Sequence, residues 1–319
     1  MMESVWLVDP ETKNLVSPYE VNPKCKKLKA AQPFTVSILS AVVAEDLDGF
    51  LQGNNDVLIL SKSSLGSQPL VERIHCFEEE IPTGRPIKNI LADNIFITDD
   101  FNGDDRLWLE LHVLEVDRHK ASERKAMTQS FQGLATTAGA IFPAILPYAF
   151  GASAIAALAD KLVSALEKDT SVVKVPFALY PDAPRFGRAV MQTGTYVAFS
   201  QMKDNSSYKL QQNGLLTTGN KPSDSSYIVF QVAPIKQACP EFVTNQKLAT
   251  LLTQMKNGNP STPAATIDFL MNTLTQYDNF IKLNRYIDLK NKGADISTEE
   301  KTLLKTIEKI EALKPFLPK

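Results

Sequence analysis

The chain has 319 residues, of which 44% are hydrophobic and 22% are charged, so it is long enough to bury a sizeable core. This composition excludes a disordered chain, a collagen-like chain and a membrane protein with many spans. The formal net charge of −2 excludes attraction to nucleic acid by overall charge, and we expect no nucleic-acid partner.

Residues 1–33 are predicted to form an N-terminal extension. They contain neither the basic region nor the apolar run of a signal peptide. The cysteines are Cys25, Cys76 and Cys239, an odd number without a paired motif, which is typical of reduced thiols rather than of a disulfide framework. We therefore expect a cytoplasmic protein, which becomes peripheral to a membrane or inserted in it only on activation.

Residues 34–125 and 169–238 are predicted to form the two parts of one antiparallel β-sandwich. Both parts contain short runs rich in β-branched residues that are separated by turn signals, as in sandwich strands. Asn102-Gly103 predicts a β-hairpin between the flanking strands, because both residues tolerate a positive φ. The predicted strands cover residues 34–40, 57–61, 94–98, 107–116, 172–180, 194–199, 208–210 and 227–233.

An acidic pattern in the first part of this sandwich carries a resemblance to a known module. Asp48 follows the first predicted strand in a loop with glycine, and Asp56 stands just before the next strand. A second group, Glu115, Asp117 and Glu123, comes after residues 111–114 of a later strand. The stretch resembles the calcium- and phospholipid-binding conserved-region-two module of protein kinase C and synaptotagmin. The resemblance implies a β-sandwich, a lipid surface as partner, and calcium as a cofactor held by these five carboxylates.

Two interpretations of the acidic loops stay open. Calcium needs about six to eight converging oxygen ligands, which clustered carboxylates supply, but loops are also acidic simply because they are solvated. The acids in residues 99–105 do not fit the twelve-residue calcium loop, whose glycine position holds Asp105 and whose final glutamate position holds His112. We interpret this second acidic stretch as a solvated turn that keeps a strand pair soluble.

Residues 126–159 form a run of 34 residues without a charged side chain. The run lies in a predicted insert, residues 126–168, which contains two helices of about 24 and 28 Å, against about 30 Å for the hydrocarbon core of a bilayer. Basic residues flank both ends of the insert, which favours a helical hairpin that enters a membrane and returns to the same side. The residues predicted to insert are Leu134, Ile141, Phe142, Ile145, Leu146, Tyr148, Phe150 and Ile155.

The same insert has other interpretations. Each of its predicted helices carries a polar stripe, and amphipathic helices normally pack on a soluble core. The insert is then a buried cover for one face of the sandwich, a hairpin that enters lipid only under certain conditions, or a permanent anchor. If the sandwich resemblance holds, the insert follows Glu123 directly and extends a loop that meets lipid in the calcium-binding family.

Residues 239–319 are predicted to form a helical C-terminal region. Apolar residues recur three and four positions apart over residues 242–256, 263–290 and 298–313. Ser297 and Glu300 form a capping-box pattern at the start of the last helix, and Pro315 is predicted to end it. The apolar stripe of these helices is either core or partner-facing, so we expect a protein partner or self-association through them.

Catalytic signatures are absent from the sequence, including those of serine hydrolases, nucleotide-binding loops and zinc proteases. The sequence therefore predicts a non-enzymatic α+β protein, an antiparallel β-sandwich with an inserted apolar α-helical hairpin and a helical C-terminal region. Its predicted function is conditional membrane association, with pore formation by oligomers of the released hairpin. The alternative is a soluble structural or adaptor protein whose hairpin is core and whose C-terminal helices bind a protein partner.

Overall fold

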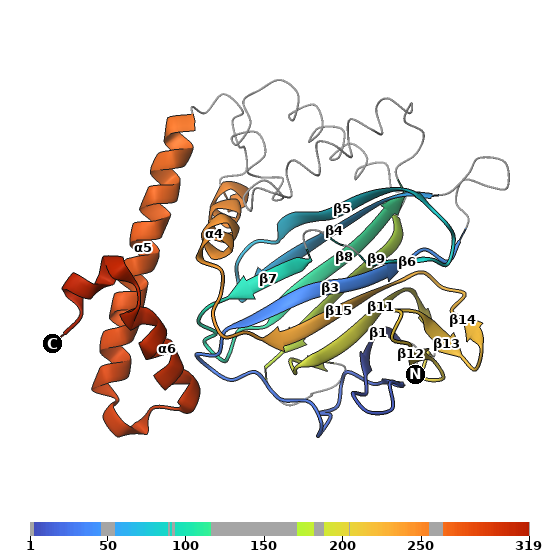
Figure 1. The fold of residues 1–319 in the computed structure, drawn as a ribbon, viewed down its shortest axis with the longest axis horizontal. Helices are drawn as coiled ribbons and strands as arrows, with labels where there is room; N and C mark the ends of the chain where they lie inside the picture. Colours follow the sequence, from blue (N-terminus) through green and yellow to red (C-terminus); the bar gives the residue numbers. More distant parts are fainter. Residues whose placement is uncertain are drawn as a thin grey trace.

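The structure, a computed structural model, describes residues 3–45, 55–88, 90, 93–115, 171–181, 188–203, 205–254 and 264–318. Within these residues the chain is an α+β protein in which two β-sheets face each other and helices follow at the C-terminal end (Figure 1). The predicted fold class is therefore confirmed for the sandwich and the helical C-terminal region. The predicted apolar insert, residues 126–168, lies outside the described residues.

The two sheets of the sandwich differ in size. The larger sheet has seven strands, in the order β2 (Leu15–Val16), β1 (Glu3–Val8), β11 (Gly194–Lys203), β15 (Tyr227–Pro234), β3 (Phe34–Val42) and β6 (Pro86–Ile87), with β7 (Asn94–Thr98) also paired to β3. The smaller sheet has five strands, in the order β10 (Ala189–Val190), β9 (Ser171–Tyr180), β8 (Leu107–Glu115), β4 (Asn55–Leu65) and β5 (Val71–Ile81). Neighbouring strands are antiparallel, except that β10 runs parallel to β9.

Alternation along the strands builds the core between the sheets. Every second residue of β8, from Leu107 to Val113, is fully buried and faces the larger sheet. Phe177 of β9 packs against Phe230 of β15 with ring centroids 5.2 Å apart, which shows that the two inner faces are in direct contact. The residues predicted as an N-terminal extension contribute to this core, since β1 pairs with β11 and buries Leu7 completely.

The predicted hairpin around Asn102-Gly103 is wrong. Strand β7 pairs with β3 in the larger sheet, whereas β8 pairs with β4 and β9 in the smaller sheet. The local turn forms as expected, since Gly103 has a φ of 94° and the Asn102 side-chain oxygen accepts two backbone N–H bonds. Phe101 just before the turn is fully buried against Phe34, so packing between the sheets separates the two strands.

A three-stranded sheet covers part of the outer face of the larger sheet. It consists of β12 (Lys209–Leu210), β13 (Leu216–Thr218) and β14 (Lys221–Pro222). Leu216 closes a second apolar cluster, and its backbone N–H donates to the Tyr227 hydroxyl at 2.9 Å. The other members of this second core include Trp6, Val8, Leu15, Val197, Phe199 and Val229.

The C-terminal region contains α4 (Pro240–Gln254), α5 (Ala264–Asn291), η1 (Gly293–Asp295), α6 (Thr298–Glu308) and η2 (Glu311–Phe316). The predicted capping box is confirmed, because Ser297 Oγ accepts the Glu300 N–H and the Glu300 carboxylate accepts the Ser297 N–H. Pro315 does not end α6, which already stops at Glu308, and it lies inside the 3₁₀ helix η2 instead.

Candidate partner-binding site

The elements α5, η1, α6 and η2 form a C-terminal unit with an apolar core of its own. Tyr286 and Leu289 of α5 pack against Leu303, Leu304 and Ile307 of α6, and all five side chains are buried. The spacing of these residues places each set on one side of its helix. Figure 1 shows the unit beside the sandwich, with α5 and α6 at one end of the sheets.

Three ion pairs join this unit to the sandwich. Lys282 Nζ lies 3.0 Å from Asp99 Oδ2, and Arg285 Nε lies 3.1 Å from Asp100 Oδ2. In the third pair, Lys29 Nζ lies 2.8 Å from a Glu299 carboxylate oxygen at the start of α6. Ala31 is fully buried in the apolar core of the unit, so the chain before β3 is part of the same contact.

The carboxylates at this contact have different surroundings. Burial raises the pKa of Asp100, while Arg285 beside it acts in the opposite direction. At the rim, the Lys29 ammonium that donates to Glu299 lowers the pKa of that carboxyl. Glu300 accepts the Ser297 N–H and a bond from Lys292, and its pKa is lowered as well. All three carboxylates at the contact are thus partly buried, and the exposed partners are the lysines, since the side chains of Lys29 and Lys292 are 64% and 50% exposed.

The acids of the 99–105 turn had been interpreted as solvated, and two of them are not. Asp99 and Asp100 accept the cations of α5, whereas Asp105 bonds to the Asn102 amide within the turn. The spacing of three between Lys282 and Arg285 places both cations on one side of α5, and that spacing was the only sequence signal for this contact.

The opposite side of α5 presents apolar side chains to solvent. Phe280 and Ile287 are seven residues apart, so at 100° per residue they share a side that points away from Arg285 and Leu289. Their exposed fractions are 56% and 36%, and Phe316 of η2 is 66% exposed. Six large apolar side chains are exposed among the described residues, and four of them belong to the C-terminal unit. These four are Phe280, Ile281, Ile287 and Phe316. We call Phe280 and Ile287 the free face.

Helix α4 is attached to the sandwich separately. The Arg73 guanidinium of β5 lies over the Phe242 ring, 4.2 Å from its centroid. The Gln246 amide donates to the Ile97 carbonyl at 3.1 Å and accepts the Ile97 N–H at 3.3 Å. Strand β7 is at the edge of its sheet, and a side chain that occupies backbone groups of an edge strand opposes pairing with another chain.

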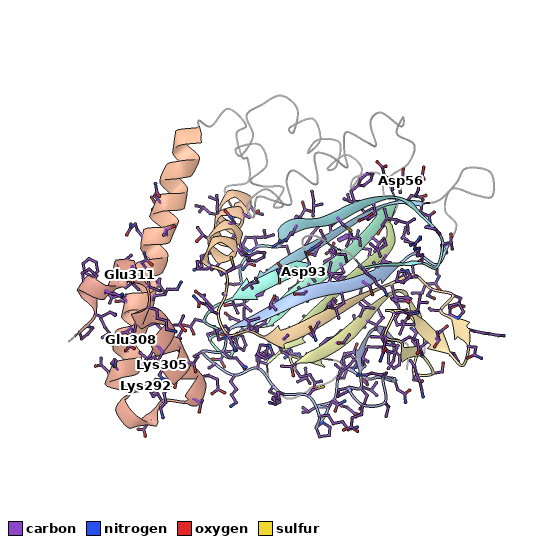
Figure 2. All side chains as sticks on the ribbon, viewed as in Figure 1. Asp56, Asp93, Lys292, Lys305, Glu308 and Glu311 are labelled. Atoms are coloured by element: carbon purple, nitrogen blue, oxygen red, sulfur yellow. The ribbon has the colours of Figure 1, made fainter. Side chains whose placement is uncertain are left out.

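Two of the predicted calcium ligands lie among the described residues, on neighbouring strands. Val57 of β4 pairs with Glu115 of β8, so alternation places Asp56 on the opposite face of the sheet from Glu115. Asp56 accepts the backbone N–H of Glu80, which has a φ of 55° at an irregularity in the pairing of β5 with β4. Figure 2 shows Asp56 at an end of the sheet remote from the C-terminal helices.

The remaining predicted site residues lie outside the described part of the chain. These are the acids Asp48, Asp117 and Glu123 and all eight residues that are predicted to insert into lipid, Leu134, Ile141, Phe142, Ile145, Leu146, Tyr148, Phe150 and Ile155. Within the described ranges, no group of three or more potential metal-ligating side chains occurs. A helix long and apolar enough to cross a membrane is likewise not found among the described helices.

The two described histidines have polar partners on the smaller sheet. His75 Nε2 lies 2.7 Å from Ser61 Oγ, and both residues are fully buried. His112 Nε2 lies 2.7 Å from a Glu110 carboxylate oxygen on the outer face, and burial lowers the pKa of this histidine. Both histidine rings therefore form hydrogen bonds within the smaller sheet.

Comparison of the whole chain with protein-family models, with curated proteins and with solved structures finds no match.

Proposed function

We propose that the protein is a non-enzymatic adaptor whose C-terminal unit binds a protein partner, of which a second copy of the chain is the first to test. The free face is the observation that carries the proposal. A side chain as large as Phe280 is costly to leave in water, and exposed apolar groups that share one side of a helix are typical of protein interfaces. The net charge of −2 opposes self-association only weakly.

The contacts between the C-terminal unit and the sandwich leave the free face pointing away from the sandwich. The ion pairs of Lys282 and Arg285 fix the rotation of α5 about its axis, because both cations meet acids of one turn. With that side of the helix occupied, Phe280 and Ile287 point outward. A partner that covers them would bury apolar area worth about 25 cal/mol per Å².

Sedimentation velocity over a range of concentrations tests this proposal. We expect the wild-type protein to associate, and Phe280→Gln with Ile287→Gln to shift it toward the monomer. Leu39→Gln is the matched control, since Leu39 is 41% exposed but lies on the sandwich in β3. A wild-type protein that stays monomeric throughout, or an equal effect of the control, contradicts self-association through the free face.

Conditional membrane association is a second candidate, and the charge-free run at residues 126–159 favours it. In this candidate the apolar hairpin enters lipid when it is released, oligomers of it form a pore, and the acidic loops bind calcium as in the conserved-region-two modules that they resemble. The protein would be cytoplasmic before release and membrane-bound after it.

Leakage of dye-loaded liposomes tests the second candidate, with calcium and with chelator, before and after limited proteolysis. Leu146→Asp and Ala138→Asp should abolish leakage and leave the β-sheet circular dichroism unchanged. Absence of both leakage and co-sedimentation under every condition would refute membrane association. If the two variants instead unfold the protein, the hairpin is core.

A further inference from the structure

A cleft of about 600 Å³ opens beside the three-stranded sheet, on the outer face of the larger sheet. Its size is within the range of about 300–1,000 Å³ that is typical of small-molecule sites. The lining comes from five separate segments of the chain, which include β1 and the turn after it, residues 24–25, the start of β11, the end of β12, and the end of β15.

The floor of the cleft is formed by β11 and β15, on the same outer face of the larger sheet that carries the second core, and its side chains are polar. Val197 of β11 and Val229 of β15 belong to this core. Because side chains alternate along a strand, Thr195 lies on the same face of β11 as Val197, and Gln231 lies on the same face of β15 as Val229. Thr195 and Gln231 are directly opposed in the sheet, and both line the cleft. The floor therefore offers a hydroxyl and an amide next to apolar surface.

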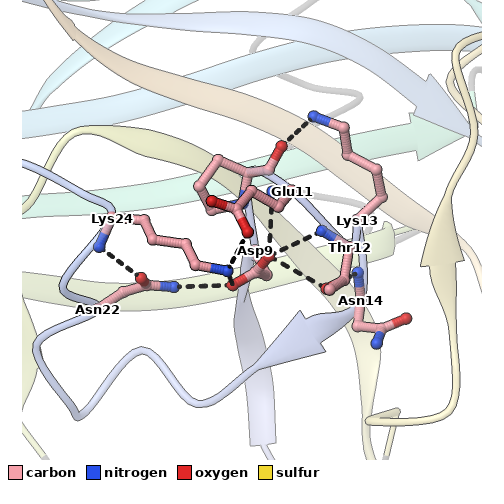
Figure 3. Close-up of polar contacts among 8 residues, drawn as sticks. Asp9, Glu11, Thr12, Lys13, Asn14, Asn22 and Lys24 are labelled. Carbon is pink, nitrogen blue, oxygen red and sulfur yellow. Dashed lines mark hydrogen bonds and ion pairs between the residues drawn. The ribbon is translucent and has the colours of Figure 1, made fainter.

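The turn after β1 forms one wall, and it is held in place by Asp9 (Figure 3). The Asp9 carboxylate accepts the N–H groups of Glu11 and Thr12, at 3.0 and 2.8 Å, and the Thr12 hydroxyl at 3.1 Å. These bonds hold the pKa of Asp9 well below its usual range. The Lys13 carbonyl in turn accepts the Leu210 N–H at 2.9 Å, which ties this wall to β12.

The charged groups that line the cleft are two lysines, and no carboxylate is among its lining residues. Lys24 is already neutralised, because its ammonium lies 2.7 Å from a Glu11 carboxylate oxygen and 3.5 Å from Asp9. Lys13 Nζ donates to the carbonyl oxygen of Pro10 at 2.6 Å, and no carboxylate of the described chain pairs with it. Lys13 is therefore the cation that remains for a ligand.

The thiol at the rim does not make this cleft a catalytic site. Cys25 is half-buried, and burial together with nearby Asp9 raises the pKa of its thiol. A protonated thiol is a weak nucleophile. Its role is to pack near the backbone of Gly194, where Cys25 Sγ and Leu7 Cδ1 would lie 3.5 and 3.0 Å from an added Cβ.

We propose that this cleft binds a short peptide that ends in a free carboxylate, with Lys13 as the carboxylate partner and Gln231 as a partner of the peptide backbone. Amide side chains offer a donor and an acceptor together, as a peptide group requires. Three glutamines line the cleft, and the side chains of Gln212 and Gln231 have no hydrogen-bond partner in the described chain. Leu210 and Ala233 supply apolar surface for a peptide side chain.

Other ligand chemistries fit the lining less well. Sugars are commonly held by stacking on aromatic rings, and no aromatic side chain is among the residues that line the cleft. Phosphate groups favour the planar fork of arginine or the N-terminus of a helix, and the lining contains neither. A single ammonium among amides and hydroxyls matches one carboxylate.

Ligand-observed NMR and titration calorimetry on the full chain test the proposal with two probes. These are a set of N-acetylated tripeptides with a free C-terminal carboxylate and the same peptides as C-terminal amides. We expect the free acids to bind about tenfold more tightly than the amides, which is a difference of about 1.4 kcal/mol. Lys13→Gln should remove this difference, and Gln231→Leu should weaken the binding of both forms.

Lys221→Gln is the matched control, because Lys221 is an exposed lysine of β14 that does not line the cleft. Absence of binding by every free acid to the wild-type protein overturns the proposal. It is also overturned if acids and amides bind equally, or if Lys221→Gln acts as Lys13→Gln does. Circular dichroism of each variant confirms that the sandwich is folded, and an unfolded Gln231→Leu is replaced by Gln231→Glu, which should repel the free acids.

Discussion

Removal of the Arg285 guanidinium should weaken the docking of the C-terminal unit, because the partly buried carboxylate of Asp100 then loses its ion-pair partner. At 3.1 Å from Asp100, an effective dielectric constant between about 40 and 80 gives an attraction of roughly 1.3–2.7 kcal/mol. The side chains are 26% and 33% exposed, so part of this attraction is screened by solvent. We expect Arg285→Gln to lower the free energy of unfolding by about 1–2 kcal/mol.

The effect of this substitution should depend on pH in a definite direction. Burial already raises the pKa of Asp100, and loss of Arg285 should raise it further. An acid with a raised pKa in the folded state destabilises the protein as the pH rises through that pKa. Arg285→Gln should therefore lower the free energy of unfolding most near neutral pH, and less in mildly acidic buffer, where Asp100 binds a proton.

Urea denaturation at neutral and at mildly acidic pH measures the loss of unfolding free energy. Lys301→Gln is the control, because Lys301 is an exposed lysine on α6. A double-mutant cycle with Asp100→Asn isolates the pair, because the charge penalty disappears once Asp100 is neutral. An equal loss at both pH values, or a coupling energy near zero, would refute the reasoning and leave Arg285 as a packing residue.

Three further predictions concern the same region and the thiols. Ile307→Ala should lower the free energy of unfolding by about 2–4 kcal/mol in urea, because it opens a cavity in the core of the C-terminal unit. Ser297→Ala should cost about 1 kcal/mol, measured by thermal denaturation, through loss of the capping box. In the native protein a thiol reagent should label Cys239, which is exposed, and not Cys76, whose burial raises its pKa; rapid labelling of Cys76 would contradict the packing of β5.

Elements with a local signal were predicted well from the sequence. The runs at residues 34–40, 107–116 and 227–233 became β3, β8 and β15, because alternation of apolar side chains reflects burial between two sheets. The capping box was predicted correctly because its two residues bond to each other within a single turn.

Contacts between distant segments left no local signal that names both partners. The cleft gathers five segments, and the residues of its floor meet only because β11 pairs with β15 in one register. The ion pair between Asp100 and Arg285 joins residues that are remote in sequence, and nothing near Asp100 distinguishes it from the solvated acids of the same turn. A sequence pattern reports the surroundings of a residue along its own element and not its partner across the fold.

The turn at residues 99–105 explains why the docking of the C-terminal unit depends on a closed sandwich. Strand β7 before the turn belongs to the larger sheet and β8 after it to the smaller sheet, so the position of the turn is defined only when the sheets are packed together. Phe101 anchors the turn in the core, and its carbonyl oxygen accepts the Ala31 N–H at 2.7 Å. Asp99 and Asp100 are thereby presented to α5. A variant that opens the sandwich at Phe101 should consequently release the C-terminal unit, whereas loss of the unit should leave the pairing of β7 with β3 and of β8 with β4 intact.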